Sequence, residues 1–335
     1  MTPRRNEYDV TNRINTTDPQ AVYGEVNRIY LDLYSDPLDD TIGRAFEDIS
    51  RLYRGEYRGY RACDTAYHNL QHTLDVTLAM ARLMDGYERS RERTQSIGAR
   101  LFSFGIVTAL FHDIGYLRHS HDTRHENGAE YTSRHVTRGA RFLDQYMREI
   151  DMLDLAVPAA RIIHFTGYEM PLDQIDLPDP LLRRIGNMLG TADIMAQMAD
   201  RCYLEKCRDR LFPEFVAGGL TLVGGAKSTS PMQFASPEDL LLKTPSFYRT
   251  AIHRLNELLG AAHRYVETHF NGQNLYLEEI AKSVKHAERL ADSKTNVYRF
   301  LRRTPPPAVA FQQIRRSRRG TAAVVSERDP ASAST

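Results

Sequence analysis

The stretch "LFSFGIVTALFHDIGY", residues 101–116, is apolar on almost every side until it reaches His112 and Asp113. An apolar run with this composition predicts a helix that is buried on all faces, and Gly115 supplies a stop signal just beyond it. The run is too short to cross a bilayer, which takes about 20 apolar residues. We therefore expect a core helix that ends at two titratable side chains.

Helical periodicity continues on both sides of this stretch. Apolar residues over 74–87 form two stripes and leave only a narrow polar edge, which predicts another helix buried on most sides. Strand signals are scarce, and the glycine-rich segment 214–237 is expected to be a loop or a small lid. Further helices are predicted over 139–153, 181–211 (ending before Pro213), 238–269 and 274–302. The fold class is therefore all-α.

One helical domain is expected over residues 21–303. Residues 1–20 are polar and are predicted to be a flexible N-terminus. Residues 304–335 are predicted to be a disordered tail, because their composition cannot bury enough apolar surface to offset the entropy of ordering.

Composition narrows the range of partners. The 335 residues carry 44 basic and 43 acidic side chains, a formal charge of +1, so no global field attracts nucleic acid or an anionic membrane. The three cysteines form no CxxC pair, which argues against a disulfide framework and for a reducing compartment. The N-terminus lacks the apolar segment of a signal peptide. We expect a cytoplasmic protein with a small-molecule partner, and the sequence leaves its oligomeric state open.

Two features of the titratable residues point to a metal site. Asp113 lies at the end of the apolar run, and a buried, unpaired carboxylate costs several kcal/mol, so it requires a partner such as a cation. In "AYHNLQH", residues 66–72, His68 and His72 are four residues apart and share one face of a helix. The pair alone does not distinguish a functional site from a polar helix start.

Other candidates are weaker when each is taken alone. Asp193 in "LGTADIMAQMADRCY" is a carboxylate among apolar neighbours, but the pattern also fits a surface aspartate. His164 in "ARIIHFTGYEM" also fits a hydrogen-bonded core histidine. The segment "RHSHDTRHENGAEYTSRH", residues 118–135, adds four histidines, which are His119, His121, His125 and His135.

In their order along the chain, His72, His112 with Asp113, a loop histidine, His164 and Asp193 resemble the HD superfamily of metal-dependent phosphohydrolases. The resemblance covers roughly residues 60–210 and implies an HD-domain helical bundle. Within that superfamily, "YHNLQHTLDV" (67–76) looks like the signature of the 3',5'-cyclic nucleotide phosphodiesterases. "HENGAEY" (125–131) looks like a loop motif of bacterial HD hydrolases and favours His125 over His121.

The sequence also departs from these relatives. No double histidine or "GYP" follows His164, unlike in the cyclic dinucleotide branch, and the loop around His125 departs from the animal cyclic nucleotide enzymes.

The resemblance implies two divalent metal ions. His72, His112, Asp113 and Asp193 would hold the first, and Asp113 would also reach a second ion supported by His125 and His164. Two such ions, about 3.5–4 Å apart, clamp an in-line displacement at phosphorus. The mixed imidazole and carboxylate ligands suit Mn, Fe, Zn or Ni, and Mg suits a more open second position. Asp75 is a candidate for orienting a ligating imidazole, although a plain surface aspartate is an equal alternative.

The reaction implied is hydrolysis of a 3',5'-cyclic nucleotide to the 5'-monophosphate, by a metal-bound hydroxide with His68 as general acid. The alternatives are an HD-type di-iron oxygenase, a hydrolase of another nucleotide (a cyclic dinucleotide or a nucleoside polyphosphate), and a metal-stabilised sensor without catalysis. Candidate residues for contacting the base follow Asp193 and are Gln197, Phe212, Gln233 and Phe234.

Overall fold

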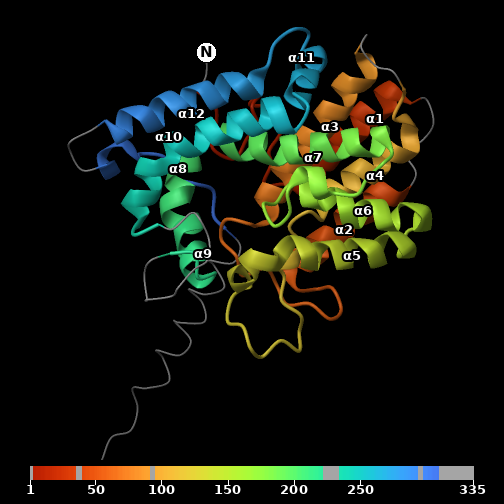
Figure 1. Cartoon of the computed structure of the whole chain (residues 1–335), viewed down its shortest axis with the longest axis horizontal. Coiled ribbons are helices and arrows are strands. Elements are labelled where there is room, and N and C mark those ends of the chain that lie inside the picture. Colours follow the sequence, from red (N-terminus) through yellow and green to blue (C-terminus); the bar gives the residue numbers. More distant parts are fainter. Residues whose placement is uncertain (1–2, 35–39, 91–94, 222–233, 293–296, 309–335) are drawn as a thin grey trace, which may run out of the picture.

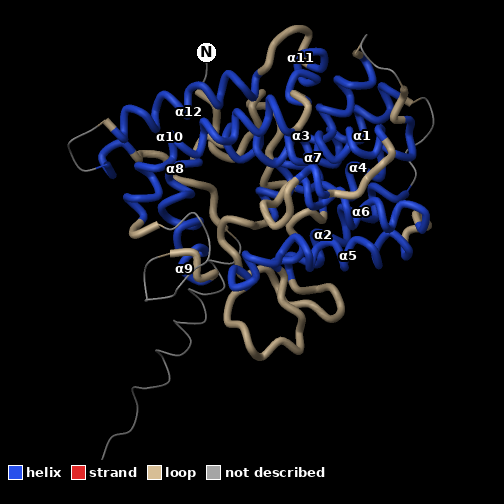
Figure 2. Tube along the Cα trace, viewed as in Figure 1, coloured by secondary structure: helices blue, strands red, loops and turns tan. Residues whose placement is uncertain are grey.

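The computed structural model describes residues 3–34, 40–90, 95–221, 234–292 and 297–308. Within these ranges every regular element is a helix, and β-pairing is limited to isolated bridges (Figures 1 and 2). The helices are α1 Pro19–Leu33, α2 Asp40–Arg54, α3 Leu70–Arg89, α4 Gly98–Leu110, α5 His135–Glu149, α6 Ala156–Ile162, α7 Pro180–Ala199, α8 Tyr203–Lys206, α9 Phe212–Ala217, α10 Pro237–His253, α11 Tyr265–His269 and α12 Leu275–Ala291. The all-α prediction is confirmed.

Helices α3 and α7 form the centre of the bundle. Helix α3 packs against α1, α4, α7 and α11, and it is buried along nearly its whole length (Figure 1). Helix α4 is apolar all round, as its sequence predicts, and Phe102 and Phe104 are fully buried. Each such side chain contributes roughly 1.5–3 kcal/mol through burial. Among the described helices, neither α4 nor any other combines the length and apolar composition that a bilayer crossing needs.

The N-terminal segment is tied to the bundle. Asp9 forms a buried ion pair with Arg82 of α3 at 2.5 Å, and Arg82 also donates to the Tyr276 hydroxyl of α12 at 3.1 Å. Arg4 donates to the carbonyl of Ala199 at the end of α7. Loss of one partner from a buried pair of this kind costs about 3–5 kcal/mol. These contacts do not match the flexible segment predicted over residues 1–20.

The predicted helix 181–211 is interrupted. Helix α7 ends at Ala199, and the Asp200 side chain accepts a hydrogen bond from the backbone N–H of Cys202 at 2.7 Å, which holds the break. The chain then continues through α8, a π-helical turn over 207–211, and α9. Pro213 does not end this helix, because it occupies the first turn of α9, where its missing N–H forfeits no helical bond.

Two other boundaries differ from the sequence prediction. Helix α9 extends to Ala217, inside the segment expected to be a loop, and residues 222–233 of that segment lie outside the described residues. The predicted helix 238–269 breaks after a second π-helical turn, where Gly260 and Ala261 adopt positive φ values of 61° and 51°. Of the predicted tail, residues 309–335 lie outside the described residues, and the carbonyl of Pro306 accepts from the buried Arg210.

Gly86 marks the closest approach of two helices and gives a test of the packing. A Cβ at this position would lie 1.7 Å from the backbone oxygen of Tyr265 in α11, so Gly86→Ala must push α3 and α11 apart. We expect a loss of unfolding free energy of about 2–3 kcal/mol, measured by urea denaturation.

Gly24→Ala in α1 is the matched control, because its Cβ would meet nothing within 4 Å. Alanine restricts the unfolded chain more than glycine does, so we expect the free energy of unfolding to rise by about 0.5–1 kcal/mol. Equal effects of the two substitutions would contradict the close approach.

Candidate active site

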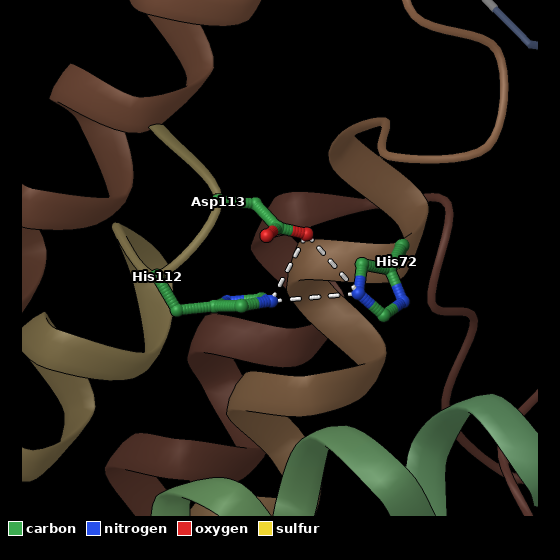
Figure 3. Close-up of side chains that lie close together, drawn as sticks. All are labelled: His72, His112 and Asp113. Carbon is green, nitrogen blue, oxygen red and sulfur yellow. Dashed lines mark hydrogen bonds and ion pairs between the residues drawn. The ribbon is translucent and has the colours of Figure 1, made fainter. Parts of the chain in front are cut away.

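Three side chains from two segments of the chain converge in the interior (Figure 3). His72 lies in the first turn of α3, and the capping side chain of Asn69 accepts its backbone N–H at 3.2 Å. His112 and Asp113 follow the end of α4. Oδ2 of Asp113 lies 3.1 Å from Nε2 of His112 and 3.3 Å from Nε2 of His72. The three side chains are buried and form what we call the ligand cluster.

The arrangement of atoms in the ligand cluster fits a cation. Nδ1 of His112 donates to the carbonyl of Ala109 at 2.8 Å, so the lone pair of the neutral ring is on Nε2, which faces the cluster. The Nε2 atoms of His112 and His72 face each other at 3.4 Å. Oδ2 of Asp113 is buried without a hydrogen bond of acceptable geometry. Electron-rich atoms therefore face one another in a dry interior, and a metal ion would relieve their repulsion.

Asp193 of α7 adds a second carboxylate. Its Oδ1 lies 3.4 Å from Nε2 of His72 and 4.0 Å from Nε2 of His112. Burial opposes protonation of His72, but the adjacent carboxylates of Asp113 and Asp193 outweigh it and raise the pKa of His72 to about 10. The two carboxylates thus favour a positive charge between them. Without a metal ion, a proton on His72 supplies that charge.

The structure places His135, and not His125, beside Asp113. His135 is the first residue of α5. Its Nε2 lies 3.8 Å from Oδ1 of Asp113, the carboxylate oxygen other than the one that lies close to His72 and His112. Nδ1 of His135 donates to the carbonyl of Thr132 at 2.7 Å, which leaves the lone pair on Nε2. Glu169 accepts from the backbone N–H groups of Val136 and Thr137, and so holds the start of this helix.

His125 is engaged elsewhere. Its Nδ1 contacts the carboxylate of Asp122 at 3.0 Å, and its Nε2 accepts from Arg134 at 2.9 Å, so both ring nitrogens already have protein partners. The ring of His121 stacks on His119. Of the histidines in residues 118–135, the structure thus places His135 beside Asp113, and not His125 or its alternative His121, which were the predicted metal ligands.

His164 is likewise apart from the ligand cluster. It lies in a 3₁₀ turn after α6, and it lines a cavity whose lining includes none of the residues around Asp113. Its Nδ1 is buried without a hydrogen-bond partner. The sequence-based prediction of His164 as a ligand of a second ion is not reproduced by this placement.

His68 is oriented by a residue that the sequence analysis missed. Nδ1 of His68 donates to Oε2 of Glu214 at 2.5 Å, and the other carboxylate oxygen accepts the backbone N–H of Tyr67. Glu214 is buried on α9. With Nδ1 bound in this way, Nε2 is the nitrogen left for proton transfer. The His68 ring centroid lies 5.9 Å from that of His72 and 6.3 Å from that of His135.

Tyr116 packs against both His68 and His135. Its ring stacks on His68 at 4.2 Å and on His135 at 4.4 Å between centroids, with interplanar angles of 15° and 22°. Tyr116 is itself buried, so it has little freedom to move. The Tyr116 ring therefore contacts both histidines and helps to hold them near each other.

The remaining candidates surround the site or lie outside the described residues. Gln197, one turn beyond Asp193 on α7, donates to the hydroxyl of Tyr203 at 3.3 Å. Phe212 is buried at the start of α9, and Phe234 stacks on Phe215 of the same helix. None of these side chains contacts the ligand cluster, and Gln233 lies outside the described residues.

Asp75 does not orient a ligating imidazole. It lines a cavity of about 10 Å³, room for roughly one water molecule, together with residues that include Gln71 and Asp200. Burial raises the pKa of Asp75 to about 6, the charge of Lys206 opposes that rise, and Asp200 adds to it. We therefore expect Asp75 to affect the stability of the folded protein.

Two sequence signals could have identified the missed residues. His135, like His72, occupies the first turn of an amphipathic helix, whereas His119, His121 and His125 precede it. Glu214 is a single carboxylate within "LFPEFV", the same kind of anomaly that singled out Asp113. Its partner could not be found from spacing, because 146 residues separate Glu214 from His68.

Paired substitutions separate the two histidine assignments. After equilibration with Mn²⁺, His135→Gln is expected to bind metal about 10–100-fold more weakly than wild type, since a lone-pair nitrogen next to Asp113 is lost. His125→Gln, the matched control, is expected to match wild type. Metal content and affinity are measured by elemental analysis and calorimetry. The opposite pattern would restore His125 as the ligand.

Asp75 gives a pH dependence of stability. A folded-state pKa of about 6, above the ordinary value of 3.8, means that the folded protein binds this proton more tightly than the unfolded chain. The contribution is fully present below about pH 4 and is lost as the pH rises through 6. Asp75→Asn should therefore be more stable than wild type at pH 7, by up to about 3 kcal/mol, and equal near pH 4. A pH-independent difference in urea titrations would contradict this.

Comparison with known proteins gives one result. The sequence model of the Npun_R2479-like family matches residues 57–289, a range that contains both His68 and Glu214 as well as the ligand cluster. No curated protein and no solved structure matches the chain. Because the matched range covers more than half of its length, the chain belongs to the Npun_R2479-like family.

Proposed function

We propose that the protein is a metal-dependent phosphohydrolase that cleaves a 3',5'-cyclic nucleotide to the 5'-monophosphate. One observation carries the proposal: a histidine held by a buried carboxylate, His68 with Glu214, lies about 6 Å from the histidines of a buried metal-type site. A site that only stabilised the fold would have no use for an oriented proton donor.

The chain's own residues divide the work. His72, His112, Asp113 and Asp193 would hold one divalent ion, and Asp113 with His135 would hold a second, which replaces the expected pair His125 and His164. Such ions, when bound, polarise the phosphoryl oxygens and lower the pKa of a water molecule. The carbonyls of Ala109 and Thr132 accept the Nδ1 protons, so that the neutral rings of His112 and His135 would present Nε2 as the ligating nitrogen.

His68 completes the reaction. The attacking water loses one proton to solvent, and the hydroxide that results attacks phosphorus as the bond to the leaving ribose oxygen breaks. Nε2 of His68 gives its proton to that oxygen. Glu214 keeps Nδ1 of the ring occupied, and Tyr116 keeps the ring parallel to itself. These two contacts orient the proposed donor ring relative to the residues proposed to hold the ions.

The cyclic nucleotide is proposed as substrate because of the segment that carries His68. The six residues "YHNLQH" (67–72) contain the proposed donor His68, the helix cap Asn69 and the proposed ligand His72. This is the combination on which the resemblance to cyclic nucleotide phosphodiesterases rests. Gln197 on α7, one turn from Asp193, has a side chain able to hydrogen-bond a base.

The test is hydrolysis of a nucleotide panel by Mn²⁺-loaded protein. The panel contains cyclic AMP, cyclic GMP, a cyclic dinucleotide and a nucleoside triphosphate, with bis(p-nitrophenyl) phosphate as a generic diester. We expect a 5'-monophosphate from at least one cyclic mononucleotide, and no turnover by Asp113→Asn. Absence of hydrolysis across the panel by protein that has bound Mn²⁺ would refute the proposal.

His68→Gln tests the donor within the same assay. We expect retained metal content, a loss of about 10²–10⁴-fold in kcat for the cyclic nucleotide, and the smallest loss for bis(p-nitrophenyl) phosphate, whose leaving group needs no proton. Glu214→Gln should shift activity in the same direction. Equal losses for all substrates would count against proton donation by His68.

A further inference from the structure

Residues 301–308, "LRRTPPPA", form a segment that packs against the part of the chain leading to Glu214, and we call it the proline strap. Leu301 and Ala308 are 9% and 3% exposed, so both ends of the proline strap are buried. Its three prolines, residues 305–307, have no backbone N–H group to satisfy and a restricted backbone, so ordering them costs little entropy. The proline strap is thus suited to present its carbonyl groups as hydrogen-bond acceptors in a fixed place.

Hydrogen bonds join the proline strap to α8 and to the π-helical turn 207–211. The backbone N–H of Arg303 donates to the buried carboxylate of Glu205 in α8 at 3.1 Å, and the Arg303 guanidinium donates to the carbonyl of Arg201. The carbonyl of Pro306 accepts from the guanidinium of Arg210, which is 7% exposed. Among the described residues, Pro306 is the one hydrogen-bond acceptor of that guanidinium. Arg210 therefore links the π-helical turn to the proline strap.

The π-helical turn and α9 need such contacts to keep their position. π-Helical geometry is rare, and α9 has six residues, fewer than a helix needs to be stable alone. Glu214 of α9 lies four residues after Arg210, and its Oε1 accepts the backbone N–H groups of Tyr67 at 2.5 Å and of His68 at 3.4 Å. The bond from Arg210 to the proline strap is therefore about one helical turn from the carboxylate that holds His68.

We infer that the proline strap positions the proposed proton donor. By holding Arg210, it keeps the π-helical turn and α9 at the place from which Glu214 reaches Tyr67 and His68. Among the described residues, the proline strap forms no hydrogen bond or ion pair with the ligand cluster, so it would act on His68 and leave metal binding intact. Its effect on turnover rests on the proposed function, whereas its effect on the contacts of Glu214 does not.

Hydrogen exchange of the backbone N–H groups of Tyr67 and His68, measured on the full chain, tests the positioning because Glu214 accepts both. In Arg210→Met and in Arg303→Met we expect these two groups to exchange about 10–100-fold faster, the effect of losing one hydrogen bond from a charged group. Arg210→Lys keeps a charged donor and should recover most of the protection.

Two references separate local from general loosening. Arg302→Met is the matched control, because Arg302 is an exposed arginine of the same segment whose side chain, among the described residues, donates only to the nearby carbonyl of Arg299. It should leave the exchange at Tyr67 unchanged. The N–H of Phe111, which donates to the carbonyl of Val107 at the end of α4, should exchange at the wild-type rate in every variant.

The exchange data alone decide the positioning. The inference is overturned if either Arg210→Met or Arg303→Met leaves the exchange at Tyr67 and His68 unchanged. It is also overturned if Arg302→Met accelerates that exchange equally, or if the N–H of Phe111 accelerates by the same factor.

Activity tests the consequence for proton donation. If the wild type hydrolyses a cyclic nucleotide, Arg210→Met should retain Mn²⁺ and lose about 10-fold in kcat with KM nearly unchanged, and it should lose less against bis(p-nitrophenyl) phosphate. An equal loss for both substrates, or none, would overturn the link to the donor. If the wild type hydrolyses nothing, the proposed function fails, and the exchange rates still decide whether the proline strap holds Glu214 in place.

Discussion

The rest of the structure depends on a contact that requires a positive charge, from a metal ion or from a proton on His72, the approach of Asp113 Oδ2 to Nε2 of His72 and of His112. A buried charge without a compensating partner costs several kcal/mol. Apolar packing of α4 and α3 around it holds the three groups together, since Phe102, Phe104 and their neighbours are fully buried. The free energy gained by apolar packing in the core thus offsets the cost of burying these polar groups, as is typical of functional sites.

The site is assembled from segments that lie far apart in the sequence. Helices α3 and α7 bring His72 and Asp193 together, the end of α4 contributes Asp113, and the start of α5 adds His135. Backbone carbonyls, not acidic side chains, set the orientation of the His112 and His135 rings. Helix packing and helix ends together therefore determine the geometry, with little contribution from irregular loops.

Residues whose environment is local were predictable from the sequence. The apolar run identified α4 as a buried helix, and the isolated carboxylate at its end identified Asp113. His125 was chosen from a local motif, but its ring nitrogens are taken up by Asp122 and Arg134, partners whose geometry depends on how the loop folds. Glu214 was missed for the opposite reason, because only tertiary packing brings α9 to His68. The break at Asp200 was missed because a side-chain cap ended a helix that propensity would have continued.

Glu214 holds the backbone of Tyr67 and the ring of His68 from a helix of only six residues, α9, which takes no part in the ligand cluster. The residues proposed to hold metal and the residue proposed to donate a proton are thus anchored in different parts of the molecule. A displacement of α9 would leave the ligands of α3, α4 and α7 assembled while releasing the donor ring. Under the proposed function, a resting metalloprotein and a working enzyme would differ by the docking of one short helix.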